Sequence, residues 1–132
     1  MKPRIEKDKL AVLCRKYNIQ LLVLHGSQAK GNAGDKSDID IGILSQVKLD
    51  LDNQLALLND FGEIFGEKFD PVFLNGAEPL ISYQVVLHGK PLFEEKEGTF
   101  QRFKIHVIAR YMDSKKFRIM EQLYLKRAVG KI

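Results

Sequence analysis

The stretch Leu24–Leu44, LHGSQAKGNAGDKSDIDIGIL, joins a glycine–serine pair to two aspartates that lie ten residues further on. Gly26 allows the backbone to approach a ligand closely, and Ser27 offers a hydroxyl and an N–H at the start of a turn. Asp38 and Asp40 occur in an apolar run that alternates with the period of a strand. Both carboxylates therefore project from one face, about 6–7 Å apart along the strand. The pattern predicts a site for a metal-bound nucleoside triphosphate.

The opposite face of this strand is apolar. Ile39, Ile41 and Ile43 alternate with the aspartates and are expected to pack into the core. Gly42 lies on the carboxylate face, where it is expected to leave room rather than fill it. The alternative for the two aspartates is an exposed edge strand or a helix cap. Two like charges on one face without a cation would repel each other and raise a pKa.

A third carboxylate is available on a later strand, predicted at 68–74. Asp70 is the acidic residue of that strand, and Pro71 confines the strand to an edge or to a non-bonded position. Mg²⁺ prefers a few carboxylates together with substrate oxygens, and two such ions can stabilise the attacking and leaving oxygens of a displacement. The alternative for Asp70 is a turn, because Asp-Pro pairs often begin turns.

The rest of the chain alternates between helical and strand patterns. We predict helices over about 3–17, 50–65, 79–88 and from 99 onward, and strands over about 19–24, 37–44, 68–74 and 90–93. Asp113-Ser114 is expected to kink or restart the last helix. This order predicts an α/β (α+β) fold, a small mixed sheet with flanking helices. Residues 1–132 are expected to form a single domain with a basic C-terminal helical segment at about 97–128.

Composition and charge narrow the class of protein. The hydrophobic and charged fractions, 45% and 29%, are those of an ordinary soluble protein. The single cysteine, Cys14, is expected to be a buried structural thiol, and it excludes an internal disulfide. No signal peptide is visible, and no apolar run approaches the about 20 residues that cross a membrane. We therefore expect a cytoplasmic protein.

The net charge of +4 is unevenly distributed. Residues 1–95 carry 11 Lys/Arg and 14 Asp/Glu, a net of −3, whereas residues 96–132 carry 10 and 3, a net of +7. The basic tail either contacts an acidic partner, nucleic acid or substrate phosphates, or is a solvated helix face. It lacks the interleaved aromatic residues of a stacking platform, so stable nucleic-acid binding is not expected.

The histidines do not form a cluster, so zinc is not expected. His25 is expected either to pack or to contact a phosphate or base. His88 is placed at a helix end, where the dipole favours imidazole, and His106 in the basic helix.

The motif formed by Gly26-Ser27 and Asp38-x-Asp40 resembles the signature of the nucleotidyltransferase superfamily related to DNA polymerase β. The chain looks like the minimal branch of that superfamily, the MNT-domain antitoxins paired with HEPN-domain ribonuclease toxins. Similarity continues through FDPVFLN, the EPLISYQVVLHGKPLF segment and a Tyr-x-Asp near the C-terminus. Lys30, where the family often has Arg, and His25, where an aromatic or apolar residue is commoner, depart from its pattern.

The resemblance implies roles for the motif residues. Asp38, Asp40 and Asp70 would be the catalytic and metal-binding residues, holding two Mg²⁺ ions and the triphosphate, with Asp70 also activating the acceptor. Gly26 and Ser27 would bind the β- and γ-phosphates. In this branch AMP passes from ATP to a tyrosine hydroxyl of the cognate HEPN toxin, which implies a hetero-oligomer with that toxin and no membrane partner.

Two alternatives remain open beside this reading. One is an antitoxin that neutralises its toxin by binding alone, through the basic C-terminal helices. The other is a nucleotidyltransferase for a small-molecule hydroxyl, although such relatives usually add a helical substrate-binding domain for which these 132 residues leave no room.

Overall fold

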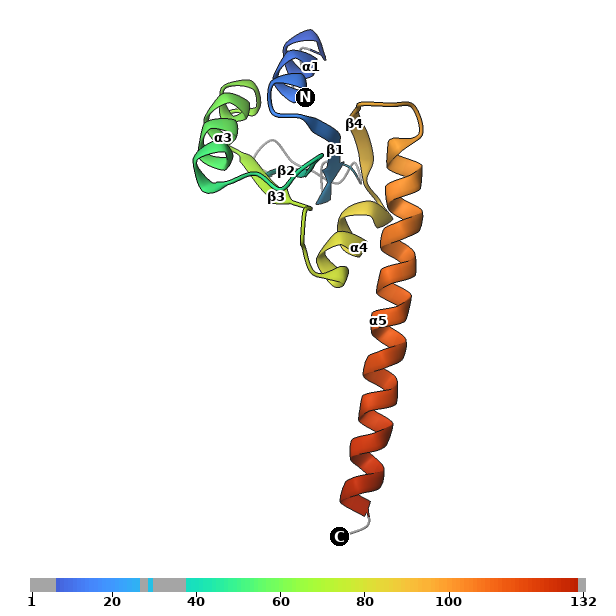
Figure 1. Cartoon of the computed structure of the whole chain (residues 1–132). Helices are drawn as coiled ribbons and strands as arrows, with labels where there is room; N and C mark the ends of the chain where they lie inside the picture. The colour runs from blue at the N-terminus through green and yellow to red at the C-terminus, as the bar shows by residue number, and fades with distance from the viewer. Residues whose placement is uncertain (1–6, 27–28, 30–37, 131–132) are drawn as a thin grey trace.

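A mixed four-stranded sheet lies at the centre of the body of the protein (Figure 1). The computed structural model describes residues 7–26, 29 and 38–130. In chain order the elements are α1 (Lys7–Lys16), β1 (Ile19–His25), β2 (Ile39–Ser45), α3 (Leu51–Phe65), β3 (Phe69–Phe73), α4 (Pro79–Leu87), β4 (Lys90–Glu94) and α5 (Thr99–Gly130). The predicted mixed sheet with flanking helices is confirmed.

The strands follow the order β3-β2-β1-β4 across the sheet. β1 pairs antiparallel with both β2 and β4, whereas β2 and β3 run parallel. β3 is thus an edge strand with one hydrogen-bonded neighbour, which explains how Pro71 is tolerated within it. Of the two positions that the sequence allowed for Pro71, an edge or a non-bonded position, the structure shows the edge.

One face of the sheet is covered by α1 and α3. Ile41 and Ile43 are completely buried there, and Ile39 is 7% exposed, as the alternation predicted. Cys14 of α1 lies in the same cluster and is fully buried. Burial raises the pKa of its thiol to about 12, so it is an inert structural residue at neutral pH. Phe61 of α3 completes the cluster.

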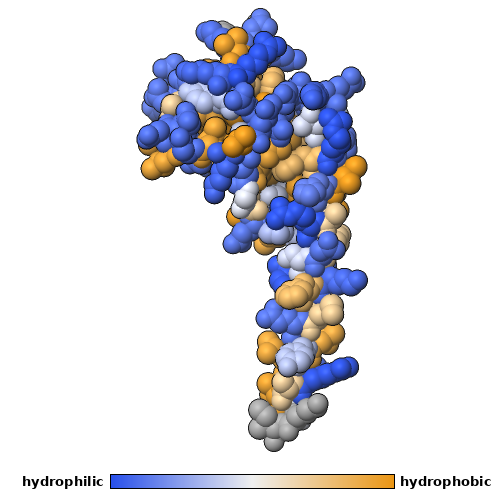
Figure 2. Space-filling model, in the orientation of Figure 1, coloured by the Kyte–Doolittle hydropathy of each residue, from blue (hydrophilic) through white to orange (hydrophobic). Residues whose placement is uncertain are grey.

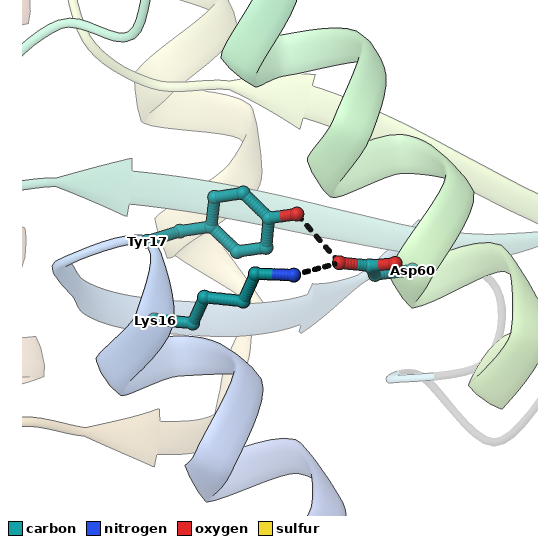
Figure 3. A network of polar contacts seen from close by, with 3 residues as sticks. All are labelled: Lys16, Tyr17 and Asp60. Atoms are coloured by element: carbon teal, nitrogen blue, oxygen red, sulfur yellow. Dashed lines mark hydrogen bonds and ion pairs between the residues drawn. The ribbon is translucent and has the colours of Figure 1, made fainter.

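A polar contact joins α1 to α3 at the rim of this core (Figure 3). The Tyr17 hydroxyl donates to Asp60 Oδ2 at 2.5 Å, and Lys16 Nζ lies 3.0 Å from the same oxygen. Hydrogen bonds from these two groups lower the pKa of Asp60. The charged carboxylate of α3 therefore holds the end of α1 against the sheet.

The other face is covered by α4 and the first half of α5. Val85 of α4 and Val107 of α5 are buried against it together with Leu74, which follows β3. Gly42 leaves room on this face, as expected, and neighbouring side chains occupy that room: a Cβ on Gly42 would lie 2.9 Å from Val85 Cγ1 and 3.1 Å from Leu74 Cδ1. The glycine thus allows α4 to pack closely on the sheet.

The last helix, α5, runs without interruption over 32 residues, from Thr99 to Gly130. Asp113 and Ser114 neither end nor restart it, so the break considered at these residues was wrong. Aspartate and serine each lower helix stability by less than about 1 kcal/mol relative to alanine, which is too little to interrupt a packed helix. Just before them, Tyr111 stacks on Tyr83 of α4 with ring centroids 4.0 Å apart and fixes the helix there. Within the described part of the chain, no helix is both long and apolar enough to cross a membrane.

Candidate active site

Three polar side chains form a row across the sheet at one end. His25, the last residue of β1, is the register partner of Asp40 on β2, and Asp40 is the register partner of Asp70 on β3. Register partners project to the same face of a sheet, and neighbouring strands lie about 4.8 Å apart. The structure therefore brings Asp40 and Asp70 together, although 29 residues separate them in the sequence.

The electrostatics of Asp40 reflect this proximity. Its pKa is raised from 3.8 to about 6 by burial, by the neighbouring Asp70 carboxyl and, more weakly, by the charge of Asp38. Asp70 acts first through a hydrogen bond between the two carboxyls, which favours the protonated form of Asp40, and then through its negative charge, whereas Asp38 acts through its charge alone. The repulsion expected from the sequence is thus present, and Asp70 contributes more to it than the nearer residue in sequence, Asp38.

The turn after β1 approaches the carboxylates closely. Gly26 has a positive φ of 69°, a conformation that side chains rarely adopt, and a Cβ on it would overlap the Asp40 carboxylate. Glycine is therefore required here for two reasons, backbone conformation and space. Asp38 is exposed and directly precedes β2. Ser27 and Lys30 lie outside the described residues.

The donor chemistry of this site suits a hard divalent cation. Asp40 and Asp70 present carboxylate oxygens, the ligands that Mg²⁺ prefers. Burial is the main cause of the raised pKa of Asp40, and the charges of Asp70 and Asp38 add to it; a cation would neutralise these charges. Among residues 7–26, 29 and 38–130, however, no three His, Cys, Asp or Glu side chains already lie in positions to hold a metal. The residues present fit a cation that is shared with a ligand's oxygens.

The sequence allowed two roles for His25, packing or contact with a phosphate or base. Its Nε2 is buried and has no hydrogen-bond partner among the residues that the structure describes, and burial lowers the pKa of the imidazole against the opposing charge of Asp70. A neutral, enclosed imidazole agrees with packing. Its place beside Asp40 depends on the pairing of β1 with β2, which no local sequence pattern reports.

A separate hollow lies on another side of the body. This groove of about 690 Å³ runs between α1 and α3 and is lined by residues such as Val12, Asp60 and Ile64. None of Asp38, Asp40 and Asp70 lines it.

A comparison with protein families identifies the family to which the chain belongs. Residues 8–98 match the family described as polymerase beta, nucleotidyltransferase. The chain belongs to this nucleotidyltransferase family. The match contains all three aspartates and the Gly26 turn, and it ends just before α5.

A curated relative indicates the branch of the family to which this nucleotidyltransferase belongs. Over 117 residues this chain is 33% identical to the protein adenylyltransferase MntA of Aphanizomenon flos-aquae (strain 2012/KM1/D3), with 81% of this chain and 78% of the relative covered. The resemblance to the minimal, MNT-domain branch is thereby confirmed.

Solved structures share the fold. A crystal structure of a toxin–antitoxin with AMP-PNP matches with a TM-score of 0.70 at 26% identity, covering 90% of this nucleotidyltransferase and 98% of that chain. A structure of tri-AMPylated Shewanella oneidensis HEPN toxin in complex with MNT antitoxin matches with a TM-score of 0.66 at 24% identity, covering 93% and 99%. At that identity the second likeness shows the fold alone.

Proposed function

We propose that this chain is a Mg²⁺-dependent protein adenylyltransferase that acts as an antitoxin. It transfers AMP from ATP to a tyrosine hydroxyl of a cognate HEPN ribonuclease toxin and thereby neutralises the toxin. The observation that carries the proposal is the row formed by Asp40 and Asp70 beside the Gly26 turn, in a chain 33% identical to a protein adenylyltransferase. The relative crystallised with AMP-PNP supports ATP as the donor.

The aspartates divide the work of this reaction. Asp38 and Asp40 would hold Mg²⁺ together with triphosphate oxygens, and Asp70 would share in holding the metal. When bound, Mg²⁺ neutralises phosphate charge and makes pyrophosphate a better leaving group. Because the pKa of Asp40 is about 6, this carboxyl is largely ionised at neutral pH and ready to bind a cation.

The bond changes are those of a nucleotidyl transfer. The tyrosine oxygen attacks the α-phosphorus of ATP, the bond to the bridging oxygen breaks, and pyrophosphate leaves. The Asp70 carboxylate would accept the hydroxyl proton of the tyrosine; its exposure on the edge strand β3 supports this role. Gly26 would keep the backbone close to the β- and γ-phosphates, with Ser27 beside it.

The proposal is tested with purified protein, the cognate HEPN toxin, Mg²⁺ and ATP labelled at the α-phosphate. We expect label on the toxin, loss of label with the Asp38→Ala/Asp40→Ala double variant or with EDTA, and a shift of the toxin mass by whole AMP units. Asp52→Ala, a change of an exposed aspartate on α3, is the matched control and should label normally. Absence of label with the wild-type protein would overturn the proposal.

A second candidate function, neutralisation by contact alone, is favoured by the exposed basic helix α5. The Asp38→Ala/Asp40→Ala variant distinguishes neutralisation by contact from neutralisation by AMP transfer. If it forms the complex and inhibits the RNase as fully as wild type without transferring label, contact suffices. If it binds but leaves the RNase active, the transfer of AMP is required.

A further inference from the structure

The second half of α5 leaves the body of the protein. Beyond Ser114 every residue up to Gly130 is exposed, and the helix projects away from the sheet and from α4 (Figure 1). The buried residues of α5, Phe100 and Val107, both belong to its first half. We refer to Lys115–Gly130 as the arm.

The arm carries large apolar side chains in water. Phe117, Tyr124 and Val129 are 70%, 72% and 69% exposed. Figure 2 shows orange, hydrophobic side chains interspersed with blue ones along this protruding helix. Exposed apolar groups gathered on one element mark an interaction site, whereas single scattered ones are normal.

These side chains do not form one stripe. At about 100° per residue, Ile119 and Leu123 share one side of the helix, Phe117 and Tyr124 lie about a third of a turn from them, and Leu125 lies on the third side. Val129 shares the side of Leu125. A flat surface, such as a bilayer, would contact one side and leave the other two in water. The arrangement requires an occupant that contacts the arm on more than one side.

The charge of the arm selects among such occupants. It carries five Lys/Arg and one Glu, Glu121, so its net charge is +4. The arm of a second copy would bring the same charge against it, and like charges pressed together are destabilising. An acidic partner protein has the complementary charge.

The arm also lacks tertiary support of its own. Isolated helices of about this length are marginal in water, because most helical stability in proteins comes from packing. A partner that encloses the arm would supply that packing.

We propose that the arm is the element by which this chain binds its toxin, inserted between toxin helices whose facing surfaces are apolar and bordered by acidic groups. This inference rests on the proposed function for the identity of the partner. The relative crystallised as a toxin–antitoxin matches 90% of this chain. The unmatched tenth is shorter than residues 115–132, so part of the arm has a counterpart in that relative.

The test measures binding to the purified cognate HEPN toxin by calorimetry, with full-length variants. Ile119→Gln/Leu123→Gln removes apolar groups from one side, and Leu125→Gln/Val129→Gln removes them from another; glutamine is a good helix former. Each pair should raise Kd at least tenfold. Leu51→Gln/Leu55→Gln on α3 removes two equally exposed leucines from the body and should leave Kd unchanged.

Turnover provides a second readout. The arm variants should raise KM for the toxin and leave kcat at saturating toxin within about twofold, because the carboxylates are untouched. Trypsin should cleave free protein at Lys115–Arg118 and Lys126–Arg127, and bound toxin should slow this cleavage by at least tenfold.

Several outcomes would overturn the inference. One is wild-type Kd in both arm variants, and another is loss of affinity in only one, which would mean a one-sided contact. The arm would be assigned to a second copy if the free chain dimerises and the same substitutions abolish dimerisation while toxin binding persists. It would be assigned to a membrane if the free chain binds phosphatidylglycerol vesicles and the substitutions abolish that binding while toxin binding persists. Toxin binding that requires the arm without any AMP transfer would refute the proposed function and leave the arm in place.

Discussion

Replacing Asp40 by asparagine is expected to stabilise the metal-free protein above pH 6 while removing its activity. In the folded chain the pKa of Asp40 is raised from 3.8 to about 6. Between these values the native state binds more protons than the unfolded state, so the stability of the wild type falls as pH rises through this window. Asparagine does not ionise and escapes this loss.

The magnitude follows from the size of the shift. At 1.36 kcal/mol per pKa unit, a shift from 3.8 to about 6 corresponds to at most about 3 kcal/mol. Asp40 is only partly buried, and solvent screening reduces this value to about 1 kcal/mol. For a domain of this size the increase in Tm at pH 8 is about 4 °C.

The assay is urea denaturation of wild type and Asp40→Asn at several pH values from 4.5 to 8, in EDTA. The difference in unfolding free energy should be small at pH 4.5, grow through pH 6 and level off above pH 7. Asp113→Asn, which changes an exposed aspartate on α5, should show no such rise. Parallel curves for Asp40→Asn and wild type would refute the reasoning, since they would mean that Asp40 titrates alike in both states.

Three further substitutions test neighbouring features. Gly26→Ala places a side chain at a φ of 69° against the Asp40 carboxylate. We expect the free energy of unfolding to fall by about 1–3 kcal/mol and the rate of AMP transfer to fall at least tenfold. Wild-type values of both would contradict the close approach of Gly26 to Asp40. His25→Phe removes a buried, unpartnered nitrogen, so stability should rise by about 1 kcal/mol with transfer within about twofold of wild type; lost transfer in a stable variant would assign His25 to the substrate. Asp60→Asn removes the charge that Tyr17 contacts, so the urea midpoint should fall at pH 7. Because the pKa of Asp60 is lowered in the folded state, its stabilisation is present above pH 3.8 and lost below it, and the difference from wild type should narrow in acid.

Local patterns predicted the elements that carry the site. The alternation of Ile39, Ile41 and Ile43 with the aspartates identified both the strand and the face that is buried. Pro71 restricted its strand to an edge or to a non-bonded position, because proline has no N–H to donate to a ladder, and β3 lies at the edge. These predictions succeeded because period and hydrogen-bonding capacity are properties of neighbouring residues.

What the sequence could not predict depends on pairing between distant segments. The row from His25 to Asp40 to Asp70 exists because β1 pairs antiparallel and β3 parallel with β2, in one particular register. The room left by Gly42 was expected, but not what occupies it, because α4 and Leu74 reach that position only through the tertiary fold. Asp113 was weighed by its local propensity, which packing and helix length outweigh.

The carboxylate row and the arm carry opposite charges. Under the proposed function, the carboxylate row would repel the phosphates of ATP, and a cation bound by both the carboxylates and the phosphates would offset this repulsion. The arm carries the opposite charge and projects away from the sheet and from α4, so it would attract an acidic protein without competing for that cation. By binding the toxin through the arm, the protein would be specific for this acceptor while its active site at the sheet edge stays open. Affinity for the toxin and turnover of ATP should therefore respond to different residues.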